Sequence, residues 1–200
     1  MRSRTVRSPY ACAVLAAALF VASTSAGAAP QSKKKNTGPE TFNGKARVST
    51  GASVADAYVS IQIDQYTPEK ELTAMQQALQ SGGSAGFVTA LKKAPVAGHL
   101  KAGDKTFTIR WARQRDTAKG RVISIVTDAP VYFVGAGLPD AQSKAGFDVA
   151  VAQITVDTAG LGDGTIALAA KVKPDGQNGV EIQDYATEPV KLVSIMKVIS

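Results

Sequence analysis

The chain has 200 residues, a formal net charge of +7, one cysteine and one histidine. This length fits one domain, or one domain with processing segments. Six basic residues, Arg2, Arg4, Arg7 and the lysines at 33–35, lie ahead of the expected domain, and the rest of the chain has 17 basic and 16 acidic residues. A domain with a net charge near +1 lacks the positive surface that nucleic acid requires, so no nucleic-acid partner is expected.

The first 28 residues have the pattern of a signal peptide. Three arginines come first, an apolar run of 12 residues follows at 11–22, and Ala26-Gly27-Ala28 supplies small residues for cleavage. Twelve apolar residues are too few for a membrane-spanning helix, which needs about 20. The alternative is a buried core helix. The pattern predicts cleavage after Ala28, export to the periplasm or the exterior, and no transmembrane segment in the mature chain.

The scarcity of cysteine and histidine excludes several kinds of site. Cys12 lies in the leader, so the mature chain is predicted to have no cysteine and no thiol, iron–sulfur or cysteine–zinc chemistry. His99 is the only histidine, and no orienting partner is evident beside it. We therefore predict no catalytic residue, no metal site, no cofactor and no enzymatic activity.

Residues 29–40 are polar and are predicted to be a disordered tail, and residues 41–200 are predicted to form one β-rich domain. Polar and apolar residues alternate over 41–49 and again over 55–64, which is typical of strands with one buried face. The turn-forming sequence at 50–53 lies between them. The two strands should therefore form an antiparallel hairpin.

A helical insertion of two helices is predicted at about 67–95. Leu72, Met75 and Leu79 share one face of the first helix, and Gly82-Gly83 should end it. Ser84 can cap the second helix, which carries Phe87 on its apolar stripe. A narrow apolar stripe is typical of a helix packed on a core. The alternative is a mobile gate that uses the glycine pair as a hinge.

The rest of the chain has strand character. The expected strands lie at about 99–101, 106–112, 121–128, 131–133, 147–157, 166–172, 180–185 and 190–199. Residues 121–128 are apolar on both faces, which predicts that both faces are covered. A total of about ten strands indicates an antiparallel β-barrel or sandwich, and in a barrel the last strand could close on the first.

The strand at 106–112 contains the only tryptophan. A period of two places Phe107, Ile109 and Trp111 on one face and Arg110 on the other. Pointing inward, Arg110 could bind an acidic head group, but the alternation favours a solvated arginine. The candidate ligand contacts are Trp111, Arg110, Tyr132 and Phe87.

Acidic residues offer no clear site. Asp157 and Asp163 lie in a glycine-rich run, but the run lacks the alternating Asp/Asn ligands and the final glutamate of a calcium loop. A turn is the favoured interpretation.

Several segments together resemble a family of exported bacterial proteins without a settled activity. The resemblance implies export and a single domain, and it covers most of the mature chain without supplying any site residue. It rests on ETFNGKARV from Glu40, IDQYTPEKE from Ile63, ALQSGGSAGFVTALKKAPVAG from Ala78, RWARQR from Arg110, IVTDAPVYF from Ile125 and IQDYATEPVKL from Ile182.

Two functions remain open. The first is an exported, non-enzymatic binding protein that holds a small, largely apolar ligand in a β-barrel pocket. Small residues on the long strands, such as Ala150 and Ala152, would leave room for it, although they could also simply allow close packing. The second is a structural or assembly protein of the cell envelope, marked by a spare hydrophobic patch. The sequence does not specify the number of subunits.

Overall fold

The structure is a computed structural model that describes residues 38–50, 53–131, 144–176 and 179–199. These residues belong to one compact unit, Asn36–Ser200. Its elements are β1 (Glu40–Thr50), β2 (Ser53–Ile63), α1 (Glu69–Lys93), β3 (Gly98–Ala102), β4 (Lys105–Thr117), β5 (Gly120–Thr127), β6 (Val149–Asp157), β7 (Leu161–Pro174), β8 (Val180–Tyr185) and β9 (Val190–Lys197).

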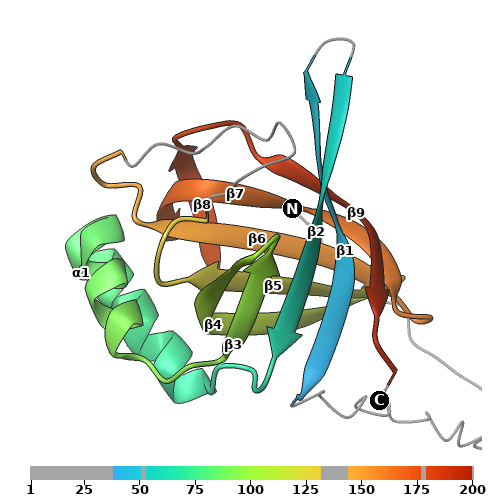
Figure 1. The fold of residues 1–200 in the computed structure, drawn as a ribbon. Helices are drawn as coiled ribbons and strands as arrows, with labels where there is room; N and C mark the ends of the chain where they lie inside the picture. The colour runs from blue at the N-terminus through green and yellow to red at the C-terminus, as the bar shows by residue number, and fades with distance from the viewer. Residues whose placement is uncertain (1–37, 51–52, 132–143, 177–178, 200) are drawn as a thin grey trace, which may run out of the picture. The chain divides into compact units, whose positions relative to one another are not determined.

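Eight of the described strands form a closed antiparallel barrel (Figure 1). Strands β1 to β7 pair in sequence order, β7 pairs with β9, and β9 pairs with β1. The ninth strand, β8, pairs with β7 beyond the end of β9 and stays outside the ring. The barrel prediction and the closure of the last strand on the first are confirmed, and the sandwich alternative is wrong. Closure satisfies both edges of the sheet with hydrogen bonds.

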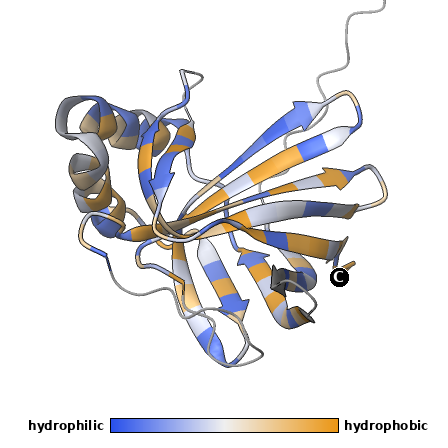
Figure 2. Cartoon of the chain, turned by 90° about the horizontal axis from the view of Figure 1, so that it is seen from above, coloured by the Kyte–Doolittle hydropathy of each residue, from blue (hydrophilic) through white to orange (hydrophobic). Residues whose placement is uncertain are grey.

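The hairpins that alternation predicted are present. Strands β1 and β2 pair along their whole length, and β4 and β5 are joined by a tight turn between Thr117 and Gly120. Figure 2 shows hydrophobic and hydrophilic bands alternating along the strands. The residues pointing inward are mostly large aliphatics, and they form one core cluster that includes Ile61, Ile63, Leu100, Ile109, Ile123, Ile125, Ile154, Ile166, Leu168, Leu192 and Ile195.

The insertion after β2 is one helix, so the prediction of two helices is wrong. The glycine pair does interrupt the helical backbone, because Gly83 adopts φ 60° and ψ −156°. That conformation is accessible essentially to glycine alone, so the chain bends there and continues as helix. Figure 1 shows α1 lying against the outside of the barrel. Among the described residues, no helix has the length and apolar character needed to cross a membrane.

A second core lies between α1 and the outer barrel wall. Leu72, Met75, Leu79, Phe87 and Leu91 of the helix pack with side chains of β4, β5, β6 and β7. The prediction that both faces of the strand at 121–128 are covered is thereby confirmed. Ile123 and Ile125 face the barrel interior, while Val126 packs beneath the helix.

Polar contacts fasten α1 to the barrel at several points. Before the helix, Thr67 exchanges two hydrogen bonds with the backbone of Ala112, each 2.9 Å long. Within the helix, Gln76 Nε2 donates to Gly179 O at 2.6 Å, and Ser84 Oγ accepts from Val172 N at 3.3 Å. These contacts support the interpretation of α1 as a packed element of the core.

Two bulges change which side chains point inward. In β4 the register shifts between Ile109 and Trp111, so Ile109 joins the interior core and Trp111 joins the core beneath α1. The prediction that these two residues share a face is wrong, because it assumed an unbroken period of two. In β9 the register shifts near Ser194, which has a left-handed φ of 53°, and Ile195 and Lys197 then turn inward.

Candidate functional site

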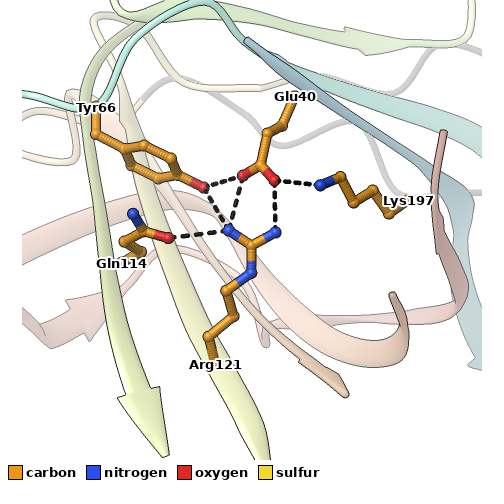
Figure 3. Close-up of polar contacts among 5 residues, drawn as sticks. All are labelled: Glu40, Tyr66, Gln114, Arg121 and Lys197. Carbon is orange, nitrogen blue, oxygen red and sulfur yellow. Dashed lines mark hydrogen bonds and ion pairs between the residues drawn. The ribbon is translucent and has the colours of Figure 1, made fainter. Parts of the chain in front are cut away.

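Five polar side chains meet at one end of the barrel interior (Figure 3). We call this group the end cluster. It consists of Glu40 at the start of β1, Tyr66 after β2, Gln114 on β4, Arg121 on β5 and Lys197 on β9. Alternation accounts for most of these positions. Glu40 is in phase with the buried Phe42 and Ala46, and Arg121 is in phase with Ile123 and Ile125.

Glu40 is the centre of the end cluster and is 4 % exposed. Arg121 donates to both of its oxygens, from Nη2 to Oε1 at 2.6 Å and from Nη1 to Oε2 at 2.8 Å. Tyr66 Oη donates to Oε2 at 2.7 Å, and Lys197 Nζ lies 2.7 Å from Oε1. Arg121 Nη1 also donates to Gln114 Oε1 at 2.9 Å. The end cluster therefore ties β1, β4, β5 and β9 together.

The electrostatics keep Glu40 ionised. Burial by itself raises the pKa of this carboxyl, but the hydrogen bonds from Arg121, Lys197 and Tyr66 outweigh it and lower the pKa to about 2. Burial and the hydrogen bond to Glu40 both raise the pKa of the Tyr66 phenol. Burial opposes the charge of Arg121, but the contacts with Glu40 outweigh this and raise its pKa. A carboxylate that is ionised at neutral pH and has both oxygens engaged is suited to holding strands together rather than to transferring protons.

A pocket of about 70 Å³ lies on the outer face of the barrel. We call it the outer pocket. Its described walls come from β4, β5, β6, the start of β8 and two residues between β7 and β8, namely Trp111, Arg113, Gln114, Arg115, Val122, Ser124, Gln153, Asp175, Gly179 and Val180. Strand pairing builds it, because Arg113 lies opposite Ser124 and Ser124 lies opposite Gln153. Arg113 Nη1 is 4.0 Å from Asp175 Oδ2, whose other oxygen accepts from Gly179 N at 2.6 Å.

Trp111 lines the outer pocket and is 1 % exposed. Its indole Nε1 is buried and has no hydrogen-bond partner among the described residues. A buried donor left unsatisfied costs about 1–3 kcal/mol, and native proteins usually satisfy such groups with a side chain, water or ligand. This donor is therefore a feature that packing alone does not explain.

The structure brings together two of the four predicted ligand contacts. Trp111 and Phe87 belong to the same core cluster beneath α1, and Trp111 also lines the outer pocket. Arg110 instead pairs with Asp128, with Nε 2.7 Å from Oδ2, and donates to Ala94 O at the end of α1 at 2.6 Å. Tyr132 lies outside the described residues, as does most of the strand predicted at 131–133.

Sequence reasoning missed the end cluster and most of the outer pocket. The sequence could have indicated Arg121 and Glu40, because each is a charged residue at the end of a strand, at a position where the alternation calls for a buried apolar residue. Lys197 had no such signal, since the bulge near Ser194 places it inside. Arg113 and Arg115 follow Trp111 at intervals of two residues on β4, and both line the outer pocket with it.

The histidine and the aspartates considered as site residues lie in strands and turns. His99 lies on β3 opposite Gln62 and Thr108. Asp157 forms a turn, with its Oδ1 accepting from Ala159 N at 2.8 Å and Leu161 N at 2.9 Å, so the turn interpretation is confirmed for this residue. It is wrong for Asp163, which lies within β7 opposite Thr155. In the described part of the chain, no group of three or more His, Cys, Asp or Glu residues is placed to hold a metal ion.

Comparison with family models, curated proteins and solved structures finds no match. The resemblance to exported bacterial proteins therefore stays a prediction. Any functional proposal for this chain rests on the geometry of its own residues.

Proposed function

We propose that this is an exported, non-catalytic binding protein that holds a small ligand, or one end of a larger one, in the outer pocket. The observation that carries the proposal is the indole N–H of Trp111, which is buried and has no hydrogen-bond partner among the described residues, in a side chain that lines this pocket. A concave site with a few convergent polar groups is the usual form of a ligand site. The volume of about 70 Å³ fits only a small molecule or a terminal group.

The described residues support the outer pocket better than the barrel interior. Half of the buried residues in the interior core are Ile and Leu, and the end cluster occupies one end of the barrel. An eight-stranded barrel is just wide enough for side chains to fill it. A largely apolar ligand inside the barrel remains a prediction from the sequence.

Native mass spectrometry of the exported chain, purified from its own fraction without detergent, tests the proposal. We expect a co-purifying mass that is lost on unfolding. Ser124→Phe should abolish it by filling the outer pocket. Ser60→Phe is the matched control, because Ser60 is also a half-buried strand serine but does not line the pocket. Retention of the ligand by the Ser124 variant would refute the assignment of the pocket.

A second function has one observation in its favour. Leu161 and Met196 lie opposite each other on β7 and β9, and each is more than half exposed. Ile199, near the end of the chain, is 91 % exposed. An exposed apolar patch of this kind supports the alternative of an envelope assembly protein, acting here through self-association. Sedimentation velocity over a range of concentrations would detect it, and Met196→Glu should abolish it.

A further inference from the structure

The charged groups around the outer pocket indicate what kind of ligand it would take. Arg113 and Arg115 are two residues apart on β4 and share the outward face of Trp111. Asp175 is the only acidic residue among the described lining residues, which together have a net charge of +1. A guanidinium presents a planar fork of donors that matches the two oxygens of a carboxylate.

The hydrogen-bond donors of the lining favour the same ligand chemistry. The indole of Trp111 and the two guanidinium groups can only donate hydrogen bonds, while Ser124 and Gln153 can donate as well as accept. A ligand that brings acceptors could use these donors. Val122 and Val180 provide apolar walls for a short carbon stem.

The ion pair already present leaves Arg113 loosely held on the side of Asp175. Arg113 Nη1 lies 4.0 Å from Asp175 Oδ2, whereas Arg47 Nε lies only 2.7 Å from Asp56 Oδ1 on the outer face of the β1–β2 hairpin. A Cβ built at Gly179 would overlap Asp175 Oδ2 and lie 2.8 Å from Arg113 Nη1, so glycine at this position leaves room for the two side chains to face each other. A second carboxylate could thus approach without breaking a tight pair.

The size of the pocket limits the part of the ligand that enters. One bound water occupies about 10–15 Å³ on the same measure of volume, so about 70 Å³ holds roughly five non-hydrogen atoms. We propose that the outer pocket binds a small carboxylate, either free or at the end of a longer molecule, through Arg113 and Arg115. This inference rests on the proposed function and specifies its ligand class.

Titration of the exported chain with matched acids and amides tests the inference. Trp111 is the only tryptophan, so its fluorescence reports directly on the pocket. The probes are acetate, propionate and butyrate against the corresponding amides, with inorganic phosphate as a further anion and chloride holding the ionic strength constant. The variants are Arg113→Gln and, as a matched control, Arg47→Gln. Arg115→Gln serves as a second pocket variant if the first fails to fold.

We expect saturable binding of at least one carboxylate, at least tenfold tighter than its amide, because the amide lacks the charge and one acceptor oxygen. Arg113→Gln should weaken this binding at least tenfold, and Arg47→Gln should leave it unchanged. Phosphate binding tighter than every carboxylate would overturn the carboxylate assignment in favour of a phosphoryl group.

Two results separate the ligand class from the proposed function. If the amides bind as tightly as the acids and Ser124→Phe still abolishes binding, the pocket is a ligand site for neutral molecules and only the carboxylate inference fails. If no probe gives a saturable response, the carboxylate inference also fails. If, in addition, native mass spectrometry finds no bound ligand, the proposed function fails with it.

Discussion

The replacement Glu40→Gln removes one negative charge from the end cluster and nearly preserves the shape of the side chain. Arg121 and Lys197 would keep their positive charges without the carboxylate that both contact. The side chain of Arg121 is 15 % exposed, whereas that of Lys197 is 34 % exposed and can turn toward water. Removing one partner of a buried ion pair costs about 3–5 kcal/mol of stability. Because Lys197 can turn toward water, we expect Glu40→Gln to cost about 3 kcal/mol, at the lower end of that range.

The pKa of Glu40 gives an independent magnitude. Folding lowers this pKa from 4.5 to about 2, and at about 1.36 kcal/mol for each pKa unit this corresponds to roughly 3 kcal/mol. Because the folded-state pKa is depressed, the stabilisation is complete well above pH 4.5. It is lost as the pH falls from about 4.5 toward 2, where the unfolded chain binds the proton first. At pH 3 about 2 kcal/mol of it should be gone.

Urea unfolding followed by Trp111 fluorescence measures both effects. At pH 7 the variant should be about 3 kcal/mol less stable than the wild type, and at pH 3 the difference should shrink to about 1 kcal/mol. Comparing the two proteins cancels the other carboxyl groups. Asp56→Asn, in the exposed pair with Arg47, is the control and should show little change. A difference that is the same at pH 7 and pH 3 would refute the assignment of the pKa shift to the end cluster.

Three further predictions concern the backbone and the core. Gly83→Ala should destabilise the fold by about 1–3 kcal/mol, whereas Gly82→Ala should not. A Cβ meets open space at both positions, and of the two residues only Gly83 has a positive φ. Thermal unfolding of the two variants measures the difference. Ser194→Gly should keep or raise the stability by up to about 1 kcal/mol, since the left-handed backbone suits glycine, and a lower unfolding midpoint in urea would contradict this. Phe87→Ala should cost about 3–5 kcal/mol in urea unfolding, because this ring is fully buried beneath α1, and a cost below about 1 kcal/mol would show that the helix is not tightly packed.

Local patterns in the sequence were sufficient to predict most of the strands and to indicate a β-barrel as one of two possible folds. The alternation in β2 is uninterrupted, so Val59, Ile61 and Ile63 were correctly assigned to one buried face. The bulges at Arg110 and Ser194 were not predictable in this way, because a bulge depends on the partner strand as well as on local composition.

The helix and the sites show why the rest required the structure. Gly82-Gly83 predicts a break in the helix, but packing of both halves on the same barrel wall makes them one bent element. The end cluster joins Glu40 and Lys197 from opposite ends of the domain, so no short motif can reveal it. Trp111 is evident in the sequence as the only tryptophan, but the lack of a hydrogen-bond partner for its indole among the described residues depends on the tertiary structure.

The closure of the barrel also affects when the domain can complete its folding. The seam joins β1 to β9 and pairs Phe42 with Lys197, so a ribosome makes one strand first and its partner last. Until β9 emerges, β1 keeps an open edge capable of pairing with other chains. Such non-local pairing slows folding, since a long loop must close before its contacts form. Nascent chains should therefore remain incompletely closed until β9 has been synthesised.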